Sequence, residues 1–350
     1  MPSPFRFALI GCGAIGRFRA QALSRTPGAQ LAVASDIEEG RGRAFEQEFG
    51  AKFLPDWQAA IASDVDAVIV STHPPLHAVM AVAALDSGKH VLCEKPLGRN
   101  PEECRRMLDA AARCGRHLAT GFNYRFYPAI VTARQVLDSG RIGELDHIRS
   151  FAGHPGGREF TQPWVYDEAV MGGGALMDNG IHILDLTRYF LGEVAEVHGY
   201  RTDRVWKHTP CEDNAFALLK STTGKIATLQ ASWTEWRGYR FWIEVYGTRG
   251  CVRASYPPML AEARWFDQLD ERPRRRYFLY PVFQVIERLR SYRWTVINSL
   301  AAELAEFVRV ATGSAKPSVA ATGFDGLRAV EVVRAVYESS STGKTAVLSA

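Results

Sequence analysis

The stretch ALIGCGAIGRFRA, residues 8–20, decides the fold of the first part of the chain. Gly11, Gly13 and Gly16 form a G-x-G-x-x-G pattern directly after a strand-like run. In such a turn the first glycine permits the tight bend, the second lets the backbone approach a pyrophosphate, and the third lets helix and strand pack closely. The helical pattern that begins at Ala14 and Ile15 would point free N–H groups at the phosphates. The stretch therefore predicts a dinucleotide-binding turn.

The cofactor is predicted from the end of the next strand-like run. LAVAS is followed by Asp36, twenty residues after Gly16. A carboxylate there can bind the adenosine ribose 2′-hydroxyl and would repel a 2′-phosphate. We therefore predict NAD. NADP stays the less favoured alternative, because Arg41 and Arg43 follow closely.

The rhythm of the chain predicts two domains. Up to about residue 123, short apolar runs alternate with helical patterns, which is typical of a parallel sheet with helices on both faces. Strand-like runs with glycine turns, such as NAFALLKSTTGKIATLQASW at 214–233, dominate afterwards. We predict an α/β protein. Residues 1–123 would form a doubly wound Rossmann domain for NAD. Residues 124–350 would form a substrate-binding and oligomerisation domain with a large, mostly antiparallel open sheet.

The composition excludes several classes of protein. The chain has 350 residues, 47% of them hydrophobic and 23% charged, which suits a soluble protein of two domains. A net charge of +4 with mostly scattered arginines indicates no nucleic-acid or membrane partner. The six cysteines form no CxxC pair, and neither a signal peptide nor a membrane-spanning run is seen. We expect a cytoplasmic protein with reduced thiols.

The run VIVSTHPPLH ends another strong strand pattern and contains further candidate residues for cofactor binding. Ligands of doubly wound sheets bind beyond the carboxyl ends of the strands, so Ser71 and Thr72 are predicted near the nicotinamide and its ribose. His73 and His77 could contact the cofactor or serve only in the turn and helix. No third ligand is placed near these histidines, and we predict no metal site.

EKPLGRN, residues 94–100, follows the apolar run HVLC. Glu94 and Lys95 thus stand at the carboxyl end of a predicted buried strand. Charged residues are rarely buried there unless they are paired. Lys95 is therefore either a salt-bridged structural residue or a residue of the functional site. We predict that Glu94 and Lys95 lie beside the cofactor.

The run MGGGALMDNGIHILDLTRYFLG predicts a buried helix with a polar stripe. Asp178, His182 and Asp185 recur at i, i+4 and i+7, on one face. Such a stripe needs partners, either in a satisfied core network or in a cleft. The carboxylates would hold the imidazole in one tautomer and raise its basicity.

These motifs together resemble the Gfo/Idh/MocA oxidoreductases, a family named for glucose–fructose oxidoreductase and inositol dehydrogenase. The resemblance covers essentially the whole chain. It rests, in order, on GCGAIG, STHPPLH, EKPLGRN, GFNYRF, GGGALMDNGIHILD and FDGLRAVEVVRAVYES. It implies a Rossmann domain followed by a domain with a large open sheet that is often used for dimer or tetramer contacts.

The resemblance also implies roles for individual residues. Lys95 matches the family's active-site lysine, and Pro96 matches a proline usually preceded by a cis bond. Asp178 and His182 match the residues that face the substrate, and Asp185 matches a further carboxylate. The implied catalytic residues are thus Lys95, Asp178 and His182. The implied substrate contacts are these three together with Tyr124 and Arg125 of GFNYRF.

The implied reaction is oxidation of a secondary alcohol in a sugar, a sugar derivative or an inositol. NAD takes the hydride, His182 takes the proton as general base, and Lys95 stabilises the developing alkoxide. Two alternatives stay open. One is a glycosidase or epimerase-like enzyme that regenerates its own NAD, and the other is a non-catalytic sensor of a dinucleotide or sugar.

Two further segments bear on the substrate. In the loop GHPGGREFTQPWVYDEA, Trp164 could stack on a sugar ring and Arg158 could contact its hydroxyls. Residues 255–298 are unusually aromatic and arginine-rich for the family. We interpret them as an inserted surface loop or an oligomer contact, or alternatively as a source of arginines (Arg274, Arg275, Arg276) for an anionic substrate.

The strands of the second domain predict self-association. AFALL, IATLQASW and FWIEVYG carry apolar residues on more than one face. A monomer would expose a large apolar area, which soluble monomers rarely do. We therefore predict a homodimer or homotetramer built on this sheet.

Overall fold

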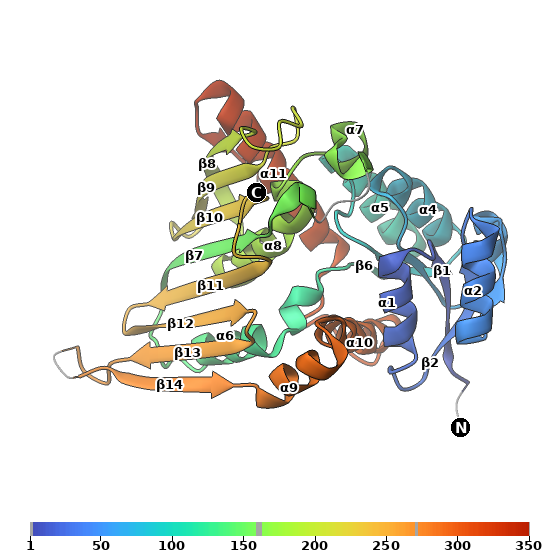
Figure 1. Ribbon diagram of the computed structural model, residues 1–350, viewed down its shortest axis with the longest axis horizontal. Coiled ribbons are helices and arrows are strands. Elements are labelled where there is room, and N and C mark those ends of the chain that lie inside the picture. Colours follow the sequence, from blue (N-terminus) through green and yellow to red (C-terminus); the bar gives the residue numbers. More distant parts are fainter. Residues whose placement is uncertain (1–2, 159–162, 270–271, 350) are drawn as a thin grey trace. The chain divides into compact units, whose positions relative to one another are not determined.

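The computed structural model describes residues 3–158, 163–269 and 272–349. The chain divides into two compact units, residues 1–126 with 287–327 and residues 127–286 with 328–350. Figure 1 follows the chain from blue at the N-terminus to red at the C-terminus.

The described residues of the first unit form a parallel sheet in the order β3-β2-β1-β4-β5-β6. Both faces of such a sheet are covered, and the AVIV run of β4 is accordingly buried throughout. The strands are β1 Phe5–Ile10, β2 Ala29–Ser35, β3 Lys52–Phe53, β4 Ala67–Val70, β5 His90–Cys93 and β6 Leu118–Thr120, and the helices before residue 127 are α1 Ala14–Leu23, α2 Glu39–Phe49, α3 Trp57–Ala62, α4 Pro74–Asp86, α5 Pro101–Cys114 and the 3-10 turn η1 Asn123–Phe126. The predicted Rossmann arrangement is confirmed.

Local signals set the ends of the helices, as α5 illustrates. Asn100 caps its start by accepting a hydrogen bond from the backbone N–H of Glu103 at 2.9 Å, and Pro101 occupies the first turn. The helix ends at Gly115, whose φ of +61° lies in the left-handed region that favours glycine. The cap at Asn100 thereby fixes the C-terminal end of the loop that contains Lys95.

The late helix α10, Arg293–Ala311, belongs to the first unit. Its Leu300, Leu304 and Phe307 join a core cluster that includes Phe7 and Leu9 of β1. The structure thus differs from the predicted boundary, which placed all residues after 123 in the second domain. The apolar face of α10 packs against α1 and β1, which are far from α10 in the sequence. No local sequence pattern predicts that contact.

The described residues of the second unit form a sheet in the order β14-β13-β12-β11-β7-β10-β9-β8-β15, in which β7 and β10 pair in parallel and the other neighbours are antiparallel. The strands are β7 Leu145–Gly153, β8 Val194–Thr202, β9 Asn214–Ser221, β10 Ile226–Ser232, β11 Arg240–Gly247, β12 Gly250–Tyr256, β13 Leu260–Trp265, β14 Arg274–Leu279 and β15 Ala346–Val347. The predicted large, mostly antiparallel sheet is confirmed.

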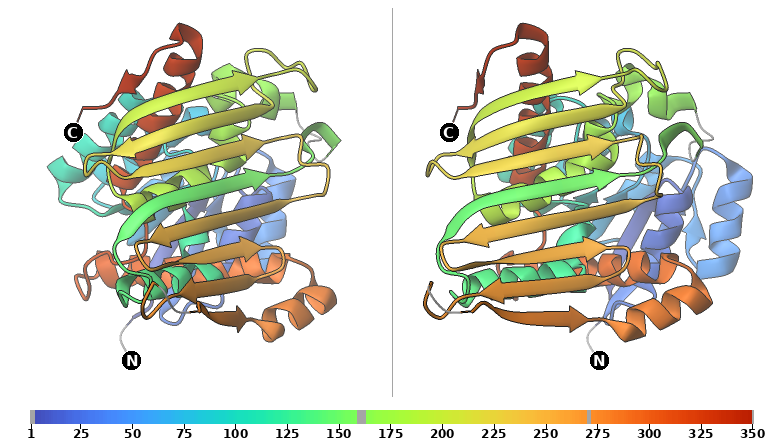
Figure 2. Two further views of the ribbon diagram at one scale, coloured as in Figure 1. Left: turned by 90° about the vertical axis from the view of Figure 1, so that its left-hand side faces the viewer. Right: turned by 60° about the vertical axis from the view of Figure 1, so that its left-hand side comes forward.

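The two faces of this sheet differ. The helices α6 Pro128–Asp138, α8 Ile181–Leu191 and the later part of α11 Gly323–Thr342 lie behind the strands in Figure 2. Strand β9 shows the consequence: Ala217 and Leu219 point to the buried face, whereas Phe216 and Leu218 lie on the other face and are 43% and 48% exposed. The open face therefore carries large apolar side chains.

Residues 255–298 do not form the inserted surface loop that was one interpretation of this segment, and the other interpretation, an oligomer contact, stays a prediction. The segment contains β13 and β14, which extend the sheet by antiparallel pairing, then helix α9 Pro281–Arg290 and the start of α10. Arg274 and Arg275 form ion pairs with Asp267 and Glu262, and the Arg276 guanidinium lies over the ring of Phe278. These contacts favour a structural role for the arginines over recognition of an anionic substrate.

The packing of α10 predicts a contrast between two leucines. Leu304 is 0% exposed in the core cluster, whereas Leu289 of α9 is 78% exposed. Leu304→Ala should destabilise the protein by about 2–5 kcal/mol because it opens a cavity, and Leu289→Ala should change stability by less than about 0.5 kcal/mol. Urea denaturation of both variants measures the difference. Equal effects would show that α10 does not stabilise the first unit.

Candidate functional site

The glycine turn of the first unit has the geometry that a dinucleotide requires. Gly11 has a φ of +98°, and a Cβ there would lie 2.6 Å from the Ser71 carbonyl oxygen. A Cβ on Gly16 would lie 1.9 Å from the Gly11 carbonyl oxygen, so helix and turn pack as closely as glycine allows. Around Gly13 a Cβ would meet nothing within 4 Å, which leaves its backbone open to a pyrophosphate. Helix α1 begins at Ala14 and Ile15, as predicted.

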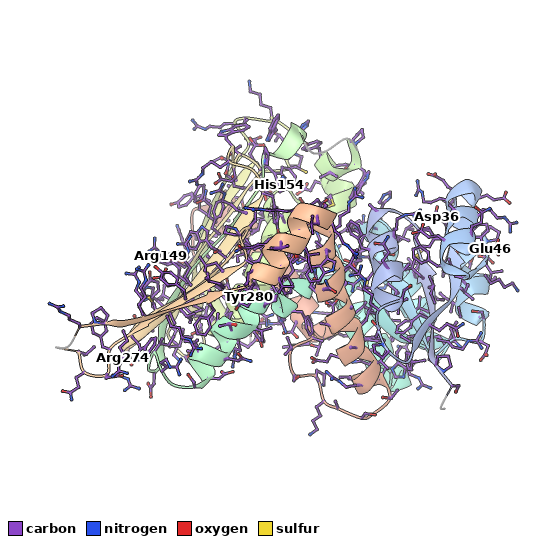
Figure 3. All side chains as sticks on the ribbon, turned by 60° about the horizontal axis from the view of Figure 1, so that its bottom comes forward. Asp36, Glu46, Arg149, His154, Arg274 and Tyr280 are labelled. Carbon is purple, nitrogen blue, oxygen red and sulfur yellow. The ribbon has the colours of Figure 1, made fainter. Side chains whose placement is uncertain are left out.

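Asp36 is held at the end of β2, next to this turn. Its carboxylate accepts hydrogen bonds from the backbone N–H groups of Cys12 at 2.7 Å and Glu38 at 2.8 Å. Arg41 lies 3.6 Å from the same carboxylate and also pairs with Glu38, and Arg43 pairs with two glutamates of α2. Arg41 and Arg43, the two residues on which the NADP alternative rests, are thus both paired with carboxylates. Asp36 and Glu46 are labelled in Figure 3.

The residues after β4 help to stabilise the glycine turn. The Ser71 hydroxyl donates to the Gly11 carbonyl oxygen at 2.9 Å. His73 occupies the N-cap position of α4 without a side-chain capping hydrogen bond. His77 is buried, and its two ring nitrogens lie 2.9 Å from the Pro96 carbonyl oxygen and 3.0 Å from that of Thr72. These contacts favour a structural role for His77 over direct contact with the cofactor.

Lys95 follows β5 and precedes Pro96 through a cis peptide bond, as the resemblance implies. Its neighbour Glu94 accepts a hydrogen bond from Arg19 Nε at 2.6 Å, and Arg19 also pairs with Glu303 of α10. Burial would lower the pKa of Arg19, but the two carboxylates raise it above its usual range. Neither Arg19 nor Glu303 is among the residues predicted from the sequence. Their only sequence signal is a charge in an otherwise apolar helix face.

Tyr124 and Arg125, predicted to contact the substrate, are buried in η1. The Arg125 guanidinium lies 3.2 Å from Asp325 and donates to the Val319 carbonyl oxygen at 3.3 Å. Arg125 therefore ties η1 to the loop before α11. Its assignment to substrate, like that of Tyr124, stays a prediction.

In the second unit the predicted buried helix starts with an irregular turn. Residues 176–180 form a π turn, and α8 begins only at Ile181. The Glu212 carboxylate accepts hydrogen bonds from the backbone N–H groups of Gly174 at 2.9 Å and Leu176 at 2.8 Å, and Tyr337 donates to it at 3.0 Å. The segment that carries Asp178 is thus tied to Glu212 and, through it, to Tyr337.

Asp178 lies in the π turn, and His182 and Asp185 follow in α8, where both are buried. The Asp178 carboxylate accepts a hydrogen bond from Trp233 Nε1 at 3.2 Å and lies 3.5 Å from His154 Nε2. His154 Nδ1 accepts from the backbone N–H of Gly156 at 3.1 Å, so the ring proton belongs on Nε2, facing Asp178. His154 is labelled in Figure 3.

His154 and Trp233 are not among the site residues predicted from the sequence. They follow Gly153 and Ser232, which are paired neighbours in the parallel strands β7 and β10. A polar residue directly after each strand was the available signal, but the pairing of these two strands could not be read from the sequence.

Trp164 lies in the 3-10 turn Pro163–Tyr166 and packs, half-buried, against a small cluster that includes Val165 and Trp233. The backbone of Arg158 ends the turn Gly156–Arg158, and its side chain lies outside the described residues. Both substrate assignments stay predictions. In the described part of the chain, no group of three His, Cys, Asp or Glu side chains could hold a metal ion, and no helix is long and apolar enough to cross a membrane.

Comparison with known proteins places the chain in a family. Residues 5–122 match the model of an oxidoreductase family with an NAD-binding Rossmann fold, and residues 130–253 match the model of the GFO/IDH/MocA C-terminal domain. Inositol 2-dehydrogenase 2 of Saccharopolyspora erythraea is 32% identical, over 97% of this chain and 94% of that protein. The chain belongs to the GFO/IDH/MocA oxidoreductases. The resemblance seen in the sequence is confirmed, and the first unit contains the family's NAD-binding Rossmann domain.

Two solved structures share the fold over almost their whole length. A levoglucosan dehydrogenase in complex with NADH has a TM-score of 0.87 and 24% identity, and the match covers 99% of both chains. GenD2 from gentamicin A biosynthesis, in complex with NAD, has a TM-score of 0.84 and 25% identity, and the match covers 100% of this chain and 98% of that chain. The two-unit fold of this GFO/IDH/MocA protein is therefore found in proteins solved with NAD or NADH.

The environment of Asp36 predicts how cofactor choice can be changed. Ile37 is 96% exposed beside it and can be replaced by a cation without disturbing the core, unlike the buried Ser35. Asp36→Ala combined with Ile37→Arg should shift the ratio of NAD to NADP dissociation constants towards NADP by at least about tenfold, or about 1.4 kcal/mol. Calorimetric titration with both cofactors measures this ratio, with Ile37→Arg alone as the control. A wild-type protein that prefers NADP would contradict the assignment.

Proposed function

We propose that the protein is an NAD-dependent dehydrogenase that oxidises a secondary alcohol of a sugar, a sugar derivative or an inositol. The observation that carries the proposal is the presence of Lys95, Asp178 and His182 together in a chain whose first unit has a complete NAD-binding turn. The similarity to proteins named inositol 2-dehydrogenase and levoglucosan dehydrogenase supports a polyol or sugar substrate.

The chain's own residues divide the chemistry between them. Bound NAD supplies the hydride acceptor. His182 takes the hydroxyl proton as general base, and its burial keeps bulk water from competing for that role. Lys95, in its charged form, stabilises the developing alkoxide. Asp178 binds a neighbouring hydroxyl, and its contacts with Trp233 and His154 fix the orientation of its carboxylate.

Removal of His182 tests this division of roles. His182→Ala should lower kcat by at least about a hundredfold, the usual scale for a lost general base, and should leave the NAD dissociation constant nearly unchanged. Turnover of the wild type should rise with pH as the imidazole loses its proton. NADH formation with a panel of sugars and inositols measures turnover, and calorimetry measures NAD binding.

His147→Ala is the matched control, because His147 is a partly exposed histidine that pairs with Asp146 on β7. If His182 merely satisfied a buried network, its loss would lower the melting temperature and leave turnover per folded molecule intact. A wild-type protein that converts sugars without net NADH formation would point instead to an enzyme that recycles its NAD.

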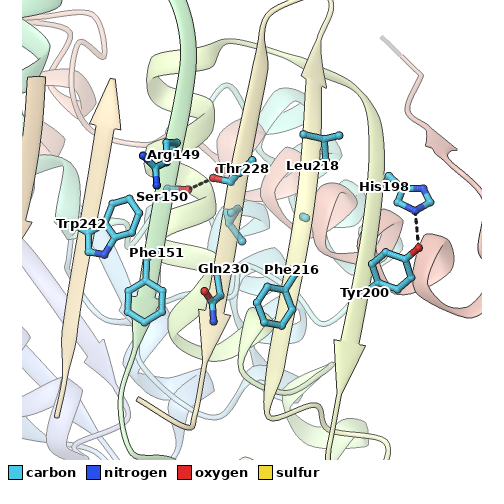
Figure 4. A pocket seen from close by; sticks show the side chains of 12 residues that line it. Arg149, Ser150, Phe151, His198, Tyr200, Phe216, Leu218, Thr228, Gln230 and Trp242 are labelled. Atoms are coloured by element: carbon cyan, nitrogen blue, oxygen red, sulfur yellow. Dashed lines mark hydrogen bonds between the residues drawn. The ribbon is translucent and has the colours of Figure 1, made fainter. Parts of the chain in front are cut away.

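We further propose that the protein self-associates through the open face of the second sheet. A groove on that face is lined by Phe151, Phe216, Leu218, Tyr200 and Trp242, with Arg149 at its side (Figure 4). The groove runs across β8, β9, β10, β7 and β11, and its exposed aromatic and aliphatic side chains suit a second copy of the same face.

The double variant Phe216→Glu, Leu218→Glu should convert the wild-type homodimer or homotetramer into smaller species, because it places charges at the centre of the apolar face. Sedimentation velocity at micromolar concentration measures the change. Val79→Glu, at an exposed position of α4, is the control and should keep the wild-type state. A monomeric wild type would refute the proposal.

A further inference from the structure

His77 joins the ends of two neighbouring strands of the first unit. It lies on α4 and is 1% exposed. Its Nδ1 is 2.9 Å from the carbonyl oxygen of Pro96, and its Nε2 is 3.0 Å from that of Thr72. Thr72 follows β4 and Pro96 follows β5, and β4 and β5 pair in parallel. The imidazole therefore spans the carboxyl ends of two strands, the edge at which doubly wound sheets bind their ligands.

The protonation of this ring determines which contact is a hydrogen bond. Burial lowers the pKa of His77, although the two carbonyl contacts oppose that shift. The ring is therefore neutral at pH 7 and carries a single N–H, which can serve only one of the two carbonyl groups. Pro96 is buried, whereas Thr72 is partly exposed to solvent. An unpaired carbonyl group costs more when it is buried, so the proton belongs on Nδ1, donated to Pro96.

The other side of Lys95 is held as well. Glu94, which directly precedes the lysine, accepts a hydrogen bond from the fully buried Arg19 at 2.6 Å. Lys95 thus stands between a residue fixed through its side chain and a residue whose carbonyl group is bound by His77. Both anchors belong to helices of the first unit, which are more rigid supports than loops.

We propose that His77 is a positioning residue for Lys95, acting through a hydrogen bond from Nδ1–H to the Pro96 carbonyl oxygen. The proposal rests on the role of Lys95 in the proposed function. A misplacement of about 1 Å at a reacting group can cost about a hundredfold in rate, so loss of this hydrogen bond should reach the chemistry although His77 itself does not touch the substrate.

Two amide substitutions separate the two contacts of the ring. In asparagine the amide nitrogen is bonded to Cγ, as Nδ1 is in histidine, so His77→Asn keeps a donor towards Pro96. In glutamine the amide nitrogen is bonded to Cδ, as Nε2 is bonded to Cδ2 in histidine, so His77→Gln keeps a donor towards Thr72 instead. His77→Leu keeps neither. Glutamine and leucine are close to histidine in volume, whereas asparagine is smaller, so activity retained only in His77→Asn would reflect the Pro96 hydrogen bond and not the filling of space.

We expect His77→Asn to keep kcat within about threefold of the wild type. His77→Gln and His77→Leu should lose about tenfold to a hundredfold in kcat, with little change in the NAD dissociation constant. In a Lys95→Ala background the Gln substitution should cause no further loss, because a residue that acts through Lys95 has nothing left to position. Equal kcat in all three variants, or an undiminished loss in the Lys95→Ala background, would overturn the proposal.

Hydrogen exchange gives a readout that does not depend on turnover. Amides of residues 94–100 should exchange at the wild-type rate in His77→Asn and faster in His77→Gln and His77→Leu. Equal protection in all three would overturn the proposed hydrogen bond. If protection follows this pattern but Lys95→Ala retains full turnover, the positioning contact stands and the proposed role of Lys95 fails.

Discussion

The first unit depends on one guanidinium that is entirely buried. Arg19 stands on the helix of the phosphate-binding turn and contacts Glu94 at the end of β5 and Glu303 on α10. A buried charge is tolerated only when its partners compensate for the lost water, and removal of one partner typically costs about 3–5 kcal/mol. The three charges therefore fix the separation of the turn, the strand end that carries Lys95, and the late helix. The position of Lys95 and the inclusion of α10 in this unit follow from the same contacts.

The second unit uses a buried carboxylate for a similar purpose. Glu212 binds backbone N–H groups at the start of the segment that carries Asp178, and Tyr337 of α11 donates to the same carboxylate. Burial raises the pKa of Glu212, while these hydrogen bonds act in the opposite direction. The donors come from the glycine run and from a helix at the end of the chain. The π turn that carries Asp178 is thus fixed by residues distant from it in sequence.

Features that depend on neighbouring residues could be predicted from the sequence. Features that depend on contacts between residues far apart in the chain could not. The glycine turn, the strands and helices of the first unit, and the glycine turn between β9 and β10 have local signals, and the structure contains them. Arg19 and Glu303 are 284 positions apart, and no local pattern pairs them. The π turn depends on Glu212, 36 positions after Leu176. Helical spacing alone predicts neither the π turn nor this contact.

The two units place their polar groups by the same rule of strand direction. Neighbouring antiparallel strands end at opposite edges of a sheet, whereas the carboxyl ends of parallel strands meet at one edge. In the first unit this brings Gly11, Asp36 and Lys95 to one edge, after β1, β2 and β5. Among the described strands of the second sheet, β7 and β10 form the one parallel pair, and His154 and Trp233 follow their carboxyl ends to reach Asp178. A single parallel pair in an otherwise antiparallel sheet is therefore what assembles the contacts of Asp178.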